Sequence, residues 1–150
     1  MIYLVRHAKA GDRSRWIGDD WLRPLTGEGR RQARELVERF SAERFTRIVS
    51  SPSARCLETV VPLAGAHSIA IEPHDALAEG AALSDTLKLV DECTIGGAVI
   101  CSHGDVIPNV LGHFQATAGL DLGPNPRCPK GSVWIIDGRG STTATYWPPP

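Results

Sequence analysis

Several features that mark membrane, secreted or metal-binding proteins are missing from this sequence of 150 residues. No apolar stretch is long enough to cross a bilayer, and the chain does not begin with the charged and apolar segments of a secretory signal. The four cysteines lack Cys-x-x-Cys spacing, and the histidines lack His-x-His and His-Glu-x-x-His spacing. We therefore expect a cytoplasmic protein with reduced cysteines, no metal or other cofactor, and no membrane partner.

An excess of one charge is also missing, because 16 Lys and Arg residues oppose 17 Asp and Glu residues. We accordingly expect no nucleic acid polymer as a partner. The charge is unevenly distributed, with 12 basic and 7 acidic residues in 1–55 and 4 basic and 10 acidic residues in 56–150. Much of the basic charge would lie on the outer face of a helix, but the loop before that helix could attract a small anion.

Length and composition indicate a single globular domain over residues 1–150. Short apolar runs that alternate with amphipathic stretches predict strands and helices in turn. The expected strands cover 2–5, 47–50, 69–71 and 98–101, and the expected helices cover 28–41, 51–63, 84–93 and 106–118. This order predicts an α/β fold, a three-layer αβα sandwich around a mostly parallel sheet. Strands 133–136 and 142–146, joined by a turn at 137–140, should add an antiparallel edge.

Three residues indicate where the expected helices begin and end. Thr26 has the hydroxyl of an N-cap and precedes Glu28 in the first helical turn. Pro62 should mark the last turn of its helix, because proline lacks the N–H that a helix interior uses. Ser84 should cap the next helix.

Polar residues with chemical potential follow the ends of three expected strands. Arg6 and His7 follow the first strand, Ser50 and Ser51 the second, and His103 the fourth. In a parallel sheet the carboxyl ends of the strands lie at one edge, which is where ligands bind. These residues should therefore meet in one site built from both halves of the chain.

The residue types in this site suit phosphoryl transfer, which needs a nucleophile, positive charge and a proton for the leaving group. His7 could attack phosphorus as a neutral imidazole. Arg6 and Arg55 would donate to the phosphoryl oxygens, and His103 would donate from the opposite side. A carboxyl group kept protonated by burial could supply the proton, and Glu79 is the best candidate. The alternative for Glu79 is a solvated loop carboxylate.

The loop after His7 carries Lys9, Arg13 and Arg15 together with Trp16. One hypothesis is that these cations bind the substrate, with Arg13 and Arg15 on a polyphosphate and Trp16 stacked on a base. The other is a capping loop in which Trp16 packs on the body of the protein and the arginines pair with nearby aspartates. Those aspartates are Asp12, Asp19 and Asp20.

Taken in order, four pieces of sequence resemble the signature of the histidine phosphatase superfamily, which has the phosphoglycerate-mutase-like fold. They are Arg6-His7, the Ser-Ser-Pro-Ser-Ala-Arg stretch 50–55, Glu79, and Ser102-His103-Gly104. The resemblance spans nearly the whole chain. It implies a phosphohistidine intermediate on His7, a phosphate pocket of Arg6, Arg55 and His103, an acid at Glu79, and no metal.

Within that superfamily the chain most resembles the small SixA-like phosphatases. Its residues 6–10 and 23–29 carry this likeness. Together with the later stretch Lys130-Gly131-Ser132, they also resemble the phosphatase domain fused to Nudix domains in some actinobacterial proteins. Mutases and many phosphatases carry Gly-Glu where this chain has Ala8-Lys9, and their phosphate-contacting asparagine is missing from the loop that follows. The chain therefore departs from the mutases.

The expected function is that of a metal-independent phosphatase acting on phosphomonoesters or phosphohistidine. Its partner would be a phosphorylated small molecule or a phosphohistidine protein, and the sequence leaves the oligomeric state open. One alternative is a nucleotide-directed phosphatase that uses the loop with Arg13, Arg15 and Trp16. Another is a phospho-ligand-binding module without turnover.

Overall fold

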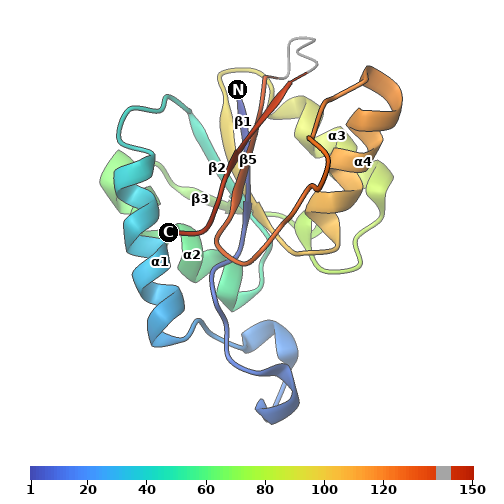
Figure 1. Cartoon of the computed structure of the whole chain (residues 1–150). Coiled ribbons are helices and arrows are strands. Elements are labelled where there is room, and N and C mark those ends of the chain that lie inside the picture. The colour runs from blue at the N-terminus through green and yellow to red at the C-terminus, as the bar shows by residue number, and fades with distance from the viewer. Residues whose placement is uncertain (138–142) are drawn as a thin grey trace.

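The computed structural model describes residues 1–137 and 143–150 and contains a six-stranded sheet between two layers of helices (Figure 1). The strands are β1 (Ile2–Arg6), β2 (Arg47–Ser50), β3 (Ile71–Pro73), β4 (Ala98–Ser102), β5 (Val133–Ile136) and β6 (Ala144–Trp147). The α-helices are α1 (Gly27–Arg39), α2 (Ala54–His67), α3 (Leu83–Glu92) and α4 (Val106–Ala118). The predicted three-layer α/β fold is confirmed.

The strands lie in the order β3-β2-β4-β1-β5-β6. Strands β3, β2, β4 and β1 are mutually parallel, whereas β5 pairs antiparallel with β1, and β6 antiparallel with β5. The expected antiparallel edge is therefore confirmed. Residues 138–140 of the expected turn, and residue 142 of the expected last strand, lie outside the described residues.

Strand β1 is buried on both faces, as the centre of such a sheet requires. Side chains alternate along it, so that Tyr3 and Val5 pack in a core cluster with α1 and α2. Ile2 and Leu4 pack in a second cluster with α3 and α4, on the opposite face (Figure 1). The apolar run at the start of the sequence thus becomes the centre of both cores.

The ends of the helices agree only partly with the sequence expectations. Thr26 caps α1, accepting a hydrogen bond from the Gly29 N–H at 3.1 Å. The expected cap at Ser84 is wrong, because α3 begins at Leu83 and Ala82 is its N-cap. No helix in the described part of the chain has both the length and the apolar character to cross a membrane.

Helix α2 continues past Pro62 to His67, so the end expected at residue 63, with Pro62 in the last turn, is wrong. Leu63 and Ala64, beyond the proline, are buried against the sheet. Their packing favours helix continuation over the loss of one backbone hydrogen bond at Pro62. The longer helix delays the next strand, which is Ile71–Pro73 instead of the expected 69–71.

A close backbone contact fixes the segment that follows β1. The Lys9 carbonyl accepts from the Thr26 N–H at 2.9 Å, and the Lys9 N–H donates to Gln32 Oε1 at 2.9 Å. Gly29 allows this approach, because a Cβ atom there would lie 2.0 Å from the Lys9 carbonyl oxygen. Helix α1 therefore holds the chain directly after His7.

The substitution Gly29→Ala tests this contact, with Gly27→Ala as its control on the same helix. A Cβ at position 27 meets nothing within 4 Å. We expect Gly29→Ala to lower the free energy of unfolding by about 1–3 kcal/mol, the typical cost of overpacking. Gly27→Ala should change it by less than about 1 kcal/mol. Chemical denaturation measures both, and equal effects would show that the close contact is unimportant.

Candidate active site

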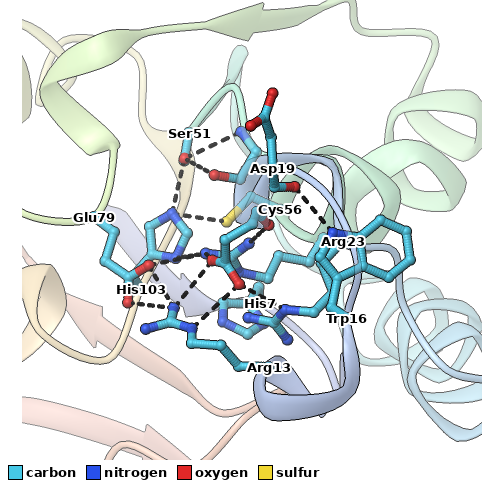
Figure 2. Close-up of polar contacts among 12 residues, drawn as sticks. His7, Arg13, Trp16, Asp19, Arg23, Ser51, Cys56, Glu79 and His103 are labelled. Carbon is cyan, nitrogen blue, oxygen red and sulfur yellow. Dashed lines mark hydrogen bonds and ion pairs between the residues drawn. The ribbon is translucent and has the colours of Figure 1, made fainter. Parts of the chain in front are cut away.

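The carboxyl edge of the sheet brings both halves of the site together. Arg6 is in register with Ser102, and Ser50 with Cys101, so the residues that follow these strands meet. The His7 N–H donates to the Ser102 carbonyl at 3.0 Å. The imidazole rings of His7 and His103 lie edge to face with centroids 5.4 Å apart (Figure 2). The expected juxtaposition of the two histidines is present.

His7 is held as a neutral imidazole with one free nitrogen. Its side chain is only 5% exposed, and Nδ1 lies 2.8 Å from the Ala8 carbonyl oxygen. Because a carbonyl only accepts, Nδ1 carries the proton and Nε2 keeps its lone pair. Burial, together with the nearby His103, Arg55 and Arg6 side chains, lowers the pKa of His7 to about 3, against the opposing effect of the Ala8 hydrogen bond.

Arg6 lies over the glycine that follows His103. A Cβ atom at Gly104 would lie 2.6 Å from Cζ of Arg6, so only glycine leaves room for the guanidinium group. Nη1 of Arg6 donates to the Cys128 carbonyl. Nε of Arg6 is buried and has no hydrogen-bond partner among the described residues. One N–H of this guanidinium group is therefore available to a ligand.

Arg55, in the first turn of α2, is a buried cation with only 1% of its side chain exposed. Its Nη1 donates to the Asp20 carbonyl at 2.8 Å, and its Nη2 to Glu79 Oε2 at 3.0 Å. Nη2 also lies 3.2 Å from Asp20 Oδ2. A charge buried this deeply needs such partners. Nε has none among the described residues, as in Arg6.

Asp20 holds three arginines around the site, whereas the sequence suggested it only as a possible partner of the loop arginines Arg13 and Arg15. Its carboxylate lies 2.9 Å from Arg23 Nε, 3.1 Å from Arg13 Nη2 and 3.2 Å from Arg55 Nη2. The hydrogen bond from Arg23 lowers the pKa of this carboxyl most, more than partial burial raises it. Asp20 thereby fixes the orientation of Arg55 from a distant part of the chain.

Glu79 reaches the site as an ion-pair partner, and the burial expected of its carboxyl is wrong. The side chain is 41% exposed. It accepts from Arg13 Nη2 at 2.7 Å and from Arg55 Nη2 at 3.0 Å (Figure 2). Glu79 therefore joins the loop after β1 to the buried Arg55.

His103 is oriented by Ser51, which the sequence placed at this edge of the sheet, and by Cys56, which it did not assign to the site. Its Nε2 lies 2.8 Å from the Ser51 hydroxyl and 3.5 Å from Cys56 Sγ. Its Nδ1 lies 3.5 Å from Arg55 Nη2, longer than an ordinary hydrogen bond. Ser51 therefore engages one ring nitrogen of His103, and Nδ1 is the one left for a ligand.

The cations of the loop are mostly paired within the protein. Lys9 Nζ lies 2.5 Å from Glu28 Oε2, and Arg15 Nε lies 3.9 Å from Asp12 Oδ2. The Trp16 indole N–H donates to the Asp19 carbonyl at 3.0 Å. With Arg13 bound to Asp20 and Glu79, these contacts correspond to the capping-loop alternative.

An open cleft of about 730 Å³ lies above His7. Of the residues singled out from the sequence, it is lined by Arg6, His7, Lys9, Arg13, Glu79 and His103. Arg15 and the buried Arg55 do not line it. Arg23 and Lys130 do, and sequence reasoning missed both. Among the described residues, no group of three or more His, Cys, Asp or Glu side chains is placed to hold a metal ion.

Comparison with known proteins agrees with the motifs and the fold. The profile of the histidine phosphatase superfamily (branch 1) matches residues 2–83. The chain is 34% identical over 157 residues to an 8-oxo-(d)GTP phosphatase from Mycolicibacterium smegmatis, a match that covers 99% of this chain and 48% of the relative. The chain thus spans about half the length of that protein.

Two solved structures share the fold. The protein histidine phosphatase SixA in complex with tungstate has a TM-score of 0.72 and 17% identity, over 97% of this chain and 92% of SixA. YhfR of Bacillus stearothermophilus has a TM-score of 0.69 and 21% identity, over 96% and 93% of the two chains. The profile match covers more than half of the sequence and includes Arg6, His7 and Arg55. The chain therefore belongs to the histidine phosphatase superfamily.

Proposed function

We propose that this chain is a phosphatase that hydrolyses phosphomonoesters or phosphohistidine through a covalent intermediate on His7. The observation that carries the proposal is the hydrogen bond between His7 Nδ1 and the Ala8 carbonyl, which leaves the lone pair on Nε2. The low pKa of His7 keeps this nitrogen unprotonated at neutral pH. A buried, oriented and neutral imidazole has the properties of a nucleophile.

The reaction would take place in two steps at the same nitrogen. In the first, Nε2 attacks phosphorus, an N–P bond forms, and the bond to the leaving group breaks with its electron pair on the leaving atom. In the second, water attacks the phosphohistidine and gives a proton to the carboxylate of Glu79, the N–P bond breaks and inorganic phosphate leaves. Nε2 of His7 regains its lone pair, so the enzyme returns to its starting state.

Arg6, Arg55 and His103 would stabilise the transferred group. The free Nε–H groups of the two arginines are buried donors that phosphoryl oxygens could satisfy. Nε2 of His103 lies 2.8 Å from the Ser51 hydroxyl, and Nδ1, when protonated, can donate to the same group. Donors held in place before the substrate binds cost no reorganisation during the reaction.

Glu79 would supply the proton that the leaving group needs, after its carboxylate, which is paired with Arg13 and Arg55 in this structure, has taken up a proton. Its carboxyl group lines the cleft beside His7, and Arg13 and Arg55 hold it in place. A different role for the same residue is to orient Arg55 without transferring a proton. The two roles make different predictions for leaving groups of different basicity.

A nucleotide-directed phosphatase is the second candidate function. The relative that covers nearly all of this chain is named as an 8-oxo-(d)GTP phosphatase. The loop hypothesis behind this candidate has less support, because Arg13 is paired and Arg15 lies outside the cleft. Nucleoside phosphates belong in the same assay as aryl phosphates and phosphohistidine peptides.

The substitution His7→Ala should abolish release of inorganic phosphate from an aryl phosphate, with a loss in kcat of at least about 1000-fold. Arg34→Ala, on the outer face of α1, serves as the control and should leave turnover unchanged. EDTA in the assay should not lower the wild-type rate. Phosphate release by a folded His7→Ala protein would refute the mechanism, and its absence from the wild-type protein would favour the binding module.

Glu79→Gln should slow hydrolysis of an alkyl phosphate by at least about 100-fold, because a basic leaving group needs a proton. An aryl phosphate with an acidic phenol needs none, so its rate should fall much less. Steady-state kcat values for a series of leaving groups measure this dependence. The same loss throughout the series would instead assign Glu79 to the positioning of Arg55.

The low pKa of His7 predicts a loss of stability in acid. The unfolded chain binds a proton at His7 below the ordinary pKa of about 6.5, whereas the folded chain does so only near its lowered value. Acid therefore favours the unfolded state through this residue. Between about pH 7 and about pH 4.5 the free energy of unfolding should fall by about 2 kcal/mol more in the wild-type protein than in His7→Asn. Urea denaturation at both pH values measures the difference, and equal falls would contradict the shifted pKa.

A further inference from the structure

The cleft extends beyond the groups that the proposed phosphoryl chemistry uses. Its volume of about 730 Å³ lies in the range of sites that enclose whole small molecules, about 300–1,000 Å³. Lys9, Arg23 and Lys130 line it together with His7, and none of them has a role in the two steps above. A second cationic region is therefore present next to the phosphoryl pocket.

Lys130 is attached to this region through its backbone neighbours. The Gly131 N–H lies 3.1 Å from both the Arg6 and the His7 carbonyl oxygens, and the Arg6 N–H donates to the Ser132 carbonyl at 3.0 Å. Gly131 has a φ of +85°, a conformation that favours glycine at this contact. The base of the Lys130 side chain is thus held beside the nucleophile.

The Lys130 ammonium has no matching carboxylate. In the described part of the chain no Asp or Glu oxygen lies within ion-pair distance of it, whereas Lys9 pairs with Glu28 and Arg23 with Asp20. Partial burial lowers the pKa of Lys130, and the positive charges of Arg6, Arg23, Arg55 and Lys9 lower it further. The local potential is therefore positive and would be relieved by a bound anion.

The carboxylates on the cleft each accept a hydrogen bond from another group, and the Asp12 carboxyl is near enough to Lys130 for the lysine charge to lower its pKa. Asp12 accepts from the Ser14 N–H at 2.9 Å, and Asp105 from the Gly80 N–H at 2.8 Å. Glu79 accepts from Arg13. The positive charge around Lys130 thus faces open space in the cleft.

We propose that Lys130, flanked by Lys9 and Arg23, forms a second anion subsite that binds the second phosphate of a diphosphate ester. The first phosphate lies in the pocket of Arg6, Arg55 and His103, within reach of His7. This inference rests on the proposed function for the position of the first phosphate. The substrate class is that of compounds with two linked phosphates, and the second phosphate is bound by Lys130 instead of Arg15.

Binding of non-hydrolysable anions tests the subsite without requiring turnover. Methylenediphosphonate and methylphosphonate are titrated by calorimetry, at one ionic strength, into the wild-type protein and into Lys130→Ala, Lys130→Arg and Lys88→Ala. Lys88 is an exposed lysine on α3 that does not line the cleft. We expect the wild-type preference for the diphosphonate to fall by at least about fivefold in Lys130→Ala. Lys130→Arg and Lys88→Ala should retain it.

Three results would overturn the subsite. The first is that the wild-type protein binds methylenediphosphonate no more tightly than methylphosphonate. The second is that Lys130→Ala weakens the binding of both anions equally, and the third is that Lys88→Ala loses the preference as well. The proposed function would fail in a different way. Either the wild-type protein would release no phosphate from any substrate, or the His7→Ala protein would still release it. Because the titrations need no catalysis, each proposal can fail while the other stands.

Discussion

Parallel pairing of β1 with β4 is the interaction on which the rest of the site depends. It joins segments nearly a hundred residues apart and sets Arg6 opposite Ser102, so that His7 and His103 follow at the same edge. The pairing is buried on both faces by two separate apolar clusters. A shift of one residue in β1 would move every side chain of the strand to the opposite face of the sheet. Because both faces are packed with apolar side chains, such a shift would disrupt both clusters, and the register is therefore strongly favoured. The catalytic geometry is therefore maintained mainly by hydrophobic packing.

Positive charge at this edge has to be balanced within the protein. Arg55 is buried where solvation would be lost, and Asp20 and Glu79 replace water as its partners. Both acidic residues come from loops, so the stable sheet supplies the position and the loops supply the charge balance. Arg13 links the same two carboxylates from the opposite side. Among the described residues, this balance leaves the Nε–H groups of Arg6 and Arg55 without hydrogen-bond partners.

Local patterns in the sequence were sufficient for most of the architecture. Alternation of short apolar runs with amphipathic helices predicted the layers, and Thr26 was correctly recognised as a cap. The errors arose where packing outweighs local preference. Helix α2 passes Pro62 because Leu63 and Ala64 are buried beyond it, and α3 begins before Ser84 on a residue with no capping side chain. Local propensity is a weak guide at such positions, because tertiary contacts contribute more.

The sequence by itself determined the fold class, the family, and the meeting of Arg6, His7, Arg55 and His103, because these follow from apolar periodicity and from motifs at the ends of strands. Only the tertiary structure decided what surrounds them. It placed Asp20 on Arg55, exposed Glu79, turned Arg15 out of the cleft and set Lys130 beside Arg6. Pairing between charged side chains depends on distances across loops, and neither composition nor periodicity specifies those distances. The meeting of His7 with His103 could therefore be predicted from the sequence, whereas the pairing of the charges around them could not.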